Sequence, residues 1–167
     1  MREGAGSATV AGRIQCTAQG NTLSIAAGSA PASFGEWSVP FSAPKTVLPD
    51  GRTLTIVKLT EKELEKCHKF NKLLFNNLIN YDTISSTISV RNRRNGDTFR
   101  PAGRGVTKSL KKLFNEGAVA PSLRGRIAML ESGGEIIWIE GFGVSQRVCV
   151  TGNTHNIAEI IIKEFET

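Results

Sequence analysis

The sequence predicts an α+β fold in which a mainly antiparallel β-sheet is accompanied by two or three short helices. Short segments alternate apolar and polar side chains, which is the period of a half-buried strand. Seventeen glycines and six prolines in 167 residues supply turns between most of these segments. Two stretches also combine a capping residue with apolar residues three and four positions apart, as in a short amphipathic helix.

Residues 1–27 are predicted to hold a linker and two strands. Residues 1–8 are rich in small and polar residues and are expected to be the linker. The strands are expected over 13–18 and 23–27, because a Gln-Gly-Asn turn at 19–21 separates two alternating segments.

An edge strand is predicted within residues 28–44, a stretch rich in Ser, Ala, Pro and Gly. Trp37, Val39 and Phe41 alternate there with polar or small residues. Pro40 has no backbone N–H, so this strand belongs at the edge of a sheet.

A turn, a strand and a helix start are predicted next. Residues 49–51 read Pro-Asp-Gly, a tight turn, and lead into an alternating strand over 53–57. Thr60 and Glu63 have the spacing of a capping box, so a helix should begin at the following residues and end by about Lys72.

The middle of the chain is predicted to contain a strand, a sharp turn and a short helix. The strand covers 87–91, and Asn95-Gly96 is the strongest turn signal in the sequence. The helix is expected over 108–116, with Thr107 as its N-cap and Gly117 as its stop. Its buried stripe would consist of Leu110, Leu113 and Phe114.

Further strands are predicted towards the C-terminus. The Ser-Gly-Gly sequence at 132–134 is interpreted as a hairpin turn, because no helix follows it as a phosphate-binding loop requires. The continuous apolar run 136–139 indicates a strand covered on both faces. The predicted strands are 127–130, 135–139, 147–150 and 158–163.

Positive charge is concentrated in one segment. The chain has 21 Lys and Arg against 15 Asp and Glu, a net charge of +6. Residues 91–126 hold ten of these bases and two acids, a net +8, so the remainder is slightly acidic at −2. Such a segment is typical of a surface that binds a polyanion, although a merely solvated basic face has the same composition.

The sequence offers no pattern for catalysis or metal binding. Cys16, Cys67 and Cys149 are far apart and form no Cys-x-x-Cys motif, which also suits a reducing cytosol. His68 and His155 have no nucleophile or carboxylate partner at a recognisable spacing. No apolar run reaches the roughly 18 residues of a membrane span. The expected partner is therefore an anionic macromolecule, with RNA phosphates favoured over stacked single-stranded bases because aromatic residues are few.

Two elements of the basic segment are expected to share one face. The loop around Asn95-Gly96 carries arginines that suit phosphate oxygens, and the predicted helix adds lysines. Gly96 and Asp97 are expected to shape the loop, with Asp97 pairing a neighbouring arginine. The candidate RNA-binding residues are Arg91, Arg93, Arg94, Arg100, Arg104, Lys108, Lys111, Lys112, Arg124 and Arg126.

The residues of this segment resemble the C-terminal domain of bacterial tRNA(Ile)-lysidine synthetases. Residues 90–103 are similar to its signature R-x-R-x-x-G-D-x-F-x-P-x-G, and 107–126 to its helix and basic turn. Residues 135–141 are similar to its E-I-x-W-x-x-G strand. The specific likeness covers about 81–151. Ala120 replaces the family's usual Ile, and Ala128-Met129 its usual Pro-Leu.

The resemblance implies a division into a β-rich lead-in over 9–80 and a synthetase C-terminal-type domain over 81–167, with both in one compact unit. It implies no catalytic residue, metal or cofactor in this part. The family's N-terminal catalytic domain would use ATP with Mg²⁺ and lysine to convert a wobble cytidine of tRNA(Ile) to lysidine, as a carbon–nitrogen ligase. This chain would grip the tRNA towards its acceptor stem, in the cytoplasm and away from any membrane.

Two other hypotheses remain open from the sequence alone. The chain could be a structural or dimerisation module whose apolar sheet packs against the catalytic domain or a second copy. It could also be an enzyme in its own right, but the sequence lacks the catalytic residues that this requires.

Overall fold

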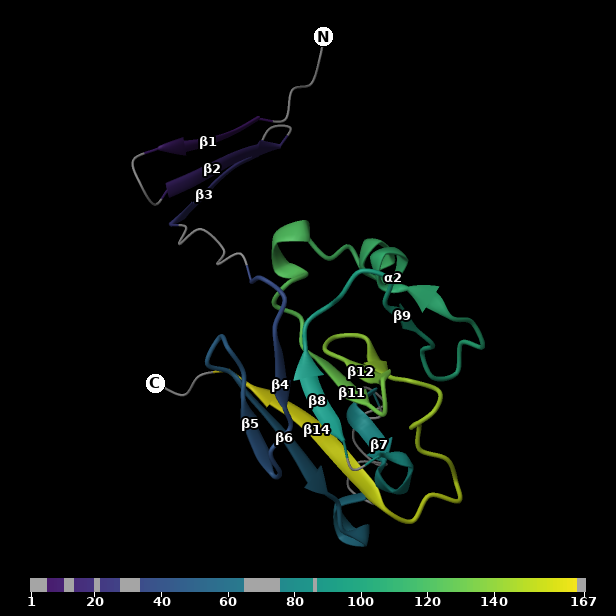
Figure 1. The fold of residues 1–167 in the computed structure, drawn as a ribbon. Coiled ribbons are helices and arrows are strands. Elements are labelled where there is room, and N and C mark those ends of the chain that lie inside the picture. The colour runs from purple at the N-terminus through teal and green to yellow at the C-terminus, as the bar shows by residue number, and fades with distance from the viewer. Residues whose placement is uncertain are drawn as a thin grey trace. The chain divides into compact units, whose positions relative to one another are not determined.

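Antiparallel sheets make up most of the structure, which confirms the predicted α+β class (Figure 1). The computed structural model describes residues 6–10, 14–19, 22–27, 34–64, 76–85 and 87–164. The chain divides into two compact units, Met1–Phe34 and Gly35–Thr167. The basic segment 91–126 lies wholly in the second unit.

The first unit is a three-stranded antiparallel sheet. Its order is β1-β2-β3, with β1 over Gly6–Val10, β2 over Ile14–Gln19 and β3 over Thr22–Ala27. The last two strands agree with the prediction. The predicted linker 1–8 is too long, because β1 begins at Gly6 and pairs with β2 from Gly6 opposite Ala18. Small residues in β1 carry a weak strand signal, so the local pattern did not indicate it.

The second unit contains a five-stranded sheet of order β13-β12-β11-β8-β4. The edge strand β4 contains Pro40, as expected for a residue without an N–H donor. The hairpin of β11 and β12 turns at Gly133 and Gly134, whose φ angles of 61° and 82° favour glycine. The strands cover Ser38–Pro40 (β4), Ile88–Arg91 (β8), Met129–Ser132 (β11), Glu135–Ile139 (β12) and Gly143–Val144 (β13).

A four-stranded sheet of order β5-β6-β14-β7 lies beside it (Figure 1). The strands cover Lys45–Val47 (β5), Thr53–Lys58 (β6), Leu78–Asn80 (β7) and Ile157–Lys163 (β14). The C-terminal strand β14 pairs with both β6 and β7. Residues 35–80 are therefore continuous with 81–167 in one unit that begins at Gly35. The division into a lead-in over 9–80 and a C-terminal-type domain over 81–167 stays a prediction. Strands β5 and β7 were not predicted, because three residues are too few to establish an alternating pattern.

The core consists of two apolar clusters on opposite faces of β11 and β12. One cluster joins the two sheets and includes Leu54, Val90 and Ile137. The other packs the helix α2, Leu110–Glu116, against Met129, Ile136 and Ile139. The run 136–139 is buried throughout, which confirms the prediction of a strand covered on both faces. This packing fixes α2 and the loops around it on one side of the sheet.

Thr60 forms the predicted capping box. Its N–H and hydroxyl both lie within hydrogen-bond distance of Glu63 Oε2, at 2.8 and 2.7 Å, and a helix begins at residue 61. The end of this helix near Lys72 lies outside the described residues.

The predicted strand 147–150 is wrong. Residues 146–148 form a turn, and Cys149 makes only an isolated bridge to Ile79. The strand in this region is β13, which precedes the turn and pairs with β12. The apolar pattern came from Val148, Cys149 and Val150; Val148 is buried in the turn without ladder pairing. Among the described residues, no helix is long and apolar enough to cross a membrane.

Candidate nucleic-acid interface

A buried ion pair organises the basic turn after β8. Asp97 accepts hydrogen bonds from Arg91 Nη1 at 2.8 Å, Arg91 Nη2 at 3.0 Å and the Arg94 backbone N–H at 2.6 Å. Arg91 Nε donates to Glu131 on the neighbouring strand β11. Gly96 has a φ of 86°, as the predicted turn requires. The turn is thus held by an Asp–Arg pair, as the sequence predicted for Asp97.

The pKa of the Asp97 carboxyl reflects this network. Burial acts to raise the pKa, but hydrogen bonds from Arg91 and from the Arg94 N–H outweigh it, and the pKa is lowered. Arg91 is itself 4 % exposed. Burial does not support its predicted place on an RNA-binding surface: Arg91 is paired with two carboxylates, Asp97 and Glu131, and only a small part of it remains accessible.

The other arginines of the turn lie closer to solvent. Arg93 and Arg94 are half-buried. Arg94 Nε donates to Glu36 Oε1 at 2.7 Å in a pair that is 40 % and 63 % exposed, so solvent screens it strongly. Arg93 has no hydrogen-bond or ion-pair partner among residues 34–64, 76–85 and 87–164. Arg93 is thus the open cation of this turn.

The helix α2 begins later than the sequence predicted. Ser109 is its N-cap, and its Oγ accepts from the Lys112 N–H at 3.3 Å. Lys108 and Ser109 instead form the short strand β10, paired with β9 at Thr98–Phe99. Thr107 therefore lies before a strand and caps nothing. The predicted stop at Gly117 and the buried stripe of Leu110, Leu113 and Phe114 are confirmed.

Three cations gather around Glu116 at the end of α2. Lys108 Nζ donates to Glu116 Oε2, and this hydrogen bond is the main cause of a lowered Glu116 pKa. The charges of Lys112 and Arg104 lower it further. Lys111 and Lys112 are exposed, whereas Lys108 is half-buried. Lys108, Lys112 and Arg104 therefore lie near one carboxylate at this end of α2. That the helix and the turn around Asn95-Gly96 form one RNA-binding face stays a prediction.

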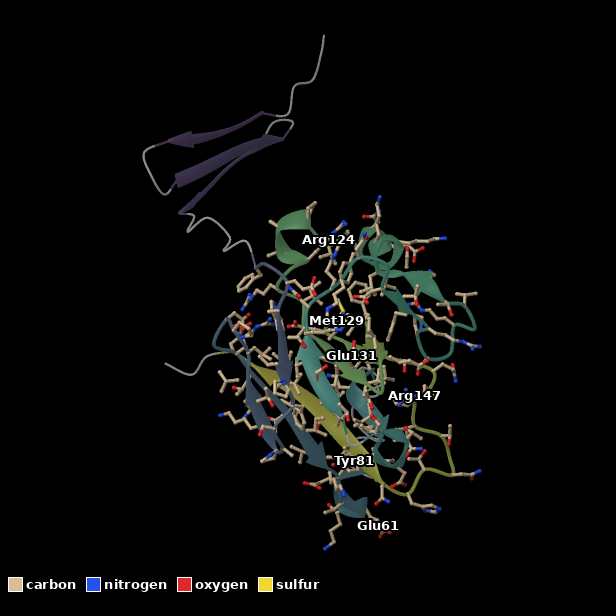
Figure 2. The ribbon with its side chains drawn as sticks, in the orientation of Figure 1. Glu61, Tyr81, Arg124, Met129, Glu131 and Arg147 are labelled. Atoms are coloured by element: carbon tan, nitrogen blue, oxygen red, sulfur yellow. The ribbon has the colours of Figure 1, made fainter. Side chains whose placement is uncertain are left out.

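Arg124 and Arg126 bond to different parts of the structure. Arg124 follows the 3₁₀ turn Pro121–Leu123 and donates to Val119 O at 3.0 Å and Asn115 Oδ1 at 2.8 Å, which fixes it beside α2 (Figure 2). Arg126 is directed to two carboxylates instead, Asp50 at 3.0 Å and Glu164 at 2.9 Å. The hydrogen bond that Arg126 donates to Asp50 raises the Arg126 pKa.

Asp50 belongs to a second ion-pair network that sequence reasoning missed. It also accepts from Arg52, which is 2 % exposed and bonded as well to Glu140. Burial acts to raise the Asp50 pKa, but the bonds from Arg126 and Arg52 outweigh it and lower the pKa. The sequence indicated Asp50 only as a turn residue, since Arg126 and Glu140, which complete the network, lie far along the chain.

A cleft of about 610 Å³ lies beside the basic surface. Its lining comes from the turn and β9, from the hairpin turn of β11 and β12, and from the turn after β13. Arg100, Thr107 and Arg147 line this cleft, and all three are exposed. Arg147 and Ser145 were not among the predicted site residues. They lie more than 40 positions from the turn. The bridge between Pro101 and Ser145, together with hydrogen bonds from Ala102 N–H to Val144 O and from Gln146 N–H to Arg100 O, brings the two segments together.

The chemistry of the site is set mainly by its cations. Among the described residues, no group of three or more His, Cys, Asp or Glu side chains is placed to hold a metal ion. The site instead presents exposed guanidinium and ammonium groups on a rigid sheet and helix. Such groups bind phosphate oxygens, Arg in a bidentate manner and Lys as a point charge.

Part of this chain is similar to a known protein family. Residues 88–161 match the family described as the TilS substrate C-terminal domain. A tRNA(Ile)-lysidine synthase from Caldanaerobacter subterraneus subsp. tengcongensis is 32 % identical over 98 residues, which are 59 % of this chain and 21 % of that protein. One from Clostridium acetobutylicum is 36 % identical over 85 residues, 51 % of this chain and 18 % of that protein. The aligned residues span about a fifth of the length of these relatives.

A solved structure has the same fold. The "Crystal structure of TILS C-terminal domain" superposes with a TM-score of 0.62 at 23 % identity, covering 80 % of this chain and all of that one. The antiparallel sheets and the helix α2 are therefore the fold of a known domain.

Proposed function

We propose that the chain is the tRNA-binding C-terminal region of a tRNA(Ile)-lysidine synthetase, on the premise that residues 88–161 match the TilS substrate C-terminal domain family. In this role it grips tRNA(Ile), towards the acceptor stem, while a catalytic domain converts the wobble cytidine to lysidine with ATP, Mg²⁺ and lysine. The chain itself binds RNA and performs no chemistry, and it works in the cytoplasm.

The observation that carries the proposal is the set of exposed cations around α2 and the loop before it. Arg104 and Lys112 act electrostatically on Glu116, and Lys111 is exposed on the same helix. RNA helices expose mainly phosphates and 2′-hydroxyls to a protein, so closely grouped cations on a rigid element suit them. The proposed surface consists of Arg93, Arg94, Arg100, Arg104, Lys108, Lys111, Lys112 and Arg124.

A salt series with a tRNA(Ile) transcript and the full chain tests this proposal. The logarithm of the binding constant should fall linearly with the logarithm of salt concentration, by about 0.7 to 0.9 per phosphate contacted. The double variant Lys111→Glu/Lys112→Glu should bind roughly tenfold or more weakly and give a shallower slope. Its fold should be intact, because both side chains are exposed.

The matched control reverses two exposed lysines of the four-stranded sheet, Lys45→Glu and Lys163→Glu. It changes the net charge by the same amount, so equal weakening by both double variants would contradict a localised surface. Sedimentation of the same samples tests the dimerisation hypothesis. If the chain sediments as a dimer and its tRNA affinity is negligible at physiological salt, the proposal is wrong and the dimerisation hypothesis is favoured.

A further inference from the structure

We infer that the cleft between the Asn95–Gly96 turn and the segment after β13 binds one unstacked ribonucleotide of the RNA. This inference rests on the proposed function and adds to it a defined subsite. The nucleotide's phosphate lies between Arg100 and Arg147, and its ribose or base edge bonds with Ser145 Oγ.

Ser145 provides the first observation. It is 5 % exposed and lies in the cleft lining. Its backbone is fully engaged, because its N–H donates to Ile137 O at 2.8 Å and its carbonyl accepts from the Val148 N–H at 3.2 Å. Within the described ranges, however, Ser145 Oγ is the one buried side-chain polar atom that has no hydrogen-bond partner.

An unsatisfied buried hydroxyl is unusual in a folded protein, since most such groups have a partner. A hydroxyl both donates and accepts, so it suits a ribose 2′-hydroxyl or the edge of a base. Nothing in the packing requires Oγ here, because it holds no other part of the chain. A ligand in the cleft explains its presence.

The charges of the lining give the second observation. Arg100 is exposed and has no ion-pair partner in the described part of the chain. Arg147 donates to Glu135 at 2.6 Å, in a pair that is 35 % and 65 % exposed, and to the carbonyls of Ser132 and Thr83, which fix it beside the hairpin turn. The lining contains three arginines, Arg91, Arg100 and Arg147, and two carboxylates, Asp97 and Glu135. One positive charge therefore remains, and the unpaired Arg100 carries it.

Size and shape favour a single nucleotide over a duplex. A cavity of about 610 Å³ falls in the range of small-ligand sites. Ser145 Oγ lies below the surface, whereas the sugars of a paired strand remain in the helix. A nucleotide must therefore leave the stack to reach it, as it does in loops, bulges and ends of RNA.

The experiment compares two RNA hairpins of equal stem sequence, one blunt and one with a short unpaired 3′ extension. Binding to the full chain is measured by fluorescence anisotropy at fixed salt. We expect the extended hairpin to bind about fivefold to tenfold more tightly, as one added hydrogen bond and phosphate contact would produce. Ser145→Ala should remove most of this preference and leave the affinity for the blunt hairpin unchanged.

A second pair of variants controls for folding. Thr107→Trp places a large side chain at the cleft, whereas Val106→Trp adds the same group at a neighbour that is 51 % exposed and outside the lining. Only Thr107→Trp should abolish the preference. Equal binding of both hairpins to the unmodified chain, or equal loss in both tryptophan variants, overturns the subsite. If neither hairpin binds, the proposed RNA-binding function fails as well.

Discussion

The turn 91–97 and the segment 104–116 carry similar positive charge in the sequence but use it differently. In the turn, Arg91 is buried and held by Asp97 and Glu131. In the second segment, Lys111 and Lys112 are exposed, and the one carboxylate nearby, Glu116, is shared among several cations. A basic residue can therefore support the fold or remain available to a ligand, and net charge does not distinguish the two.

This difference has an energetic basis. Burying a guanidinium is costly unless carboxylates compensate it, so Arg91 contributes to the fold only together with its partners. An exposed lysine retains its hydration and loses little when it is replaced. Damage to the turn should therefore lower stability, whereas damage to the exposed segment should lower RNA affinity.

The largest expected effect follows from removal of the Asp97 carboxylate. Asp97→Ala leaves Arg91 with Glu131 alone and releases the Arg94 N–H, which Asp97 binds at 2.6 Å. We expect a loss of about 3 kcal/mol in the free energy of unfolding, as for other broken buried ion pairs. Urea denaturation measures it. A loss below about 1 kcal/mol, the range of exposed pairs, would show that the turn does not depend on this pair.

Acid should lower the stability of the turn 91–97, whereas the lysines and arginines of the segment 104–116 stay charged. The Asp97 pKa is lowered in the folded state, so its contribution to stability is complete above the unfolded value of 3.8 and is lost as pH falls through the folded pKa. Asp50 behaves in the same way. Thermal unfolding from pH 6 downwards should therefore show a steep loss in the acid range.

Asp97→Asn provides the control for this pH dependence. It retains a hydrogen-bond acceptor but cannot titrate, so its stability should be lower at pH 6 and should decline less in acid. An identical pH profile for the variant and the unmodified chain would show that other carboxyl groups govern acid unfolding.

The sequence predicted the local features of this architecture well. Pro40 indicated an edge strand, Asn95-Gly96 indicated the turn, and the apolar run 136–139 indicated a strand buried on both faces. Each of these signals arises from a few adjacent residues. The likeness of residues 90–103 to a family signature also led to the domain that the comparisons identify.

The features that were missed depend on distant contacts. Arg91 reads as one more surface base until β11 brings Glu131 beside it. Arg126 likewise reads as a phosphate ligand until the fold places Asp50 and Glu164 against it. Ser145 and Arg147 join the cleft because residues 100–102 pair with residues 144–146 across a long sequence separation. No local pattern encodes these pairings.

The smallest expected effect concerns the start of α2, where sequence and structure assign different caps. Ser109→Ala removes an acceptor for the Lys112 N–H and should cost about 0.5 to 1 kcal/mol, because the 3.3 Å bond is long. Thr107→Ala should cost nothing measurable, since Thr107 is exposed and caps no helix. Thermal unfolding of the two variants measures the difference. Because the cap also orients the first turn that carries Lys111 and Lys112, Ser109→Ala should weaken RNA binding slightly as well. If Thr107→Ala is the less stable variant, Thr107 is the N-cap after all and Lys108 lies on the helix.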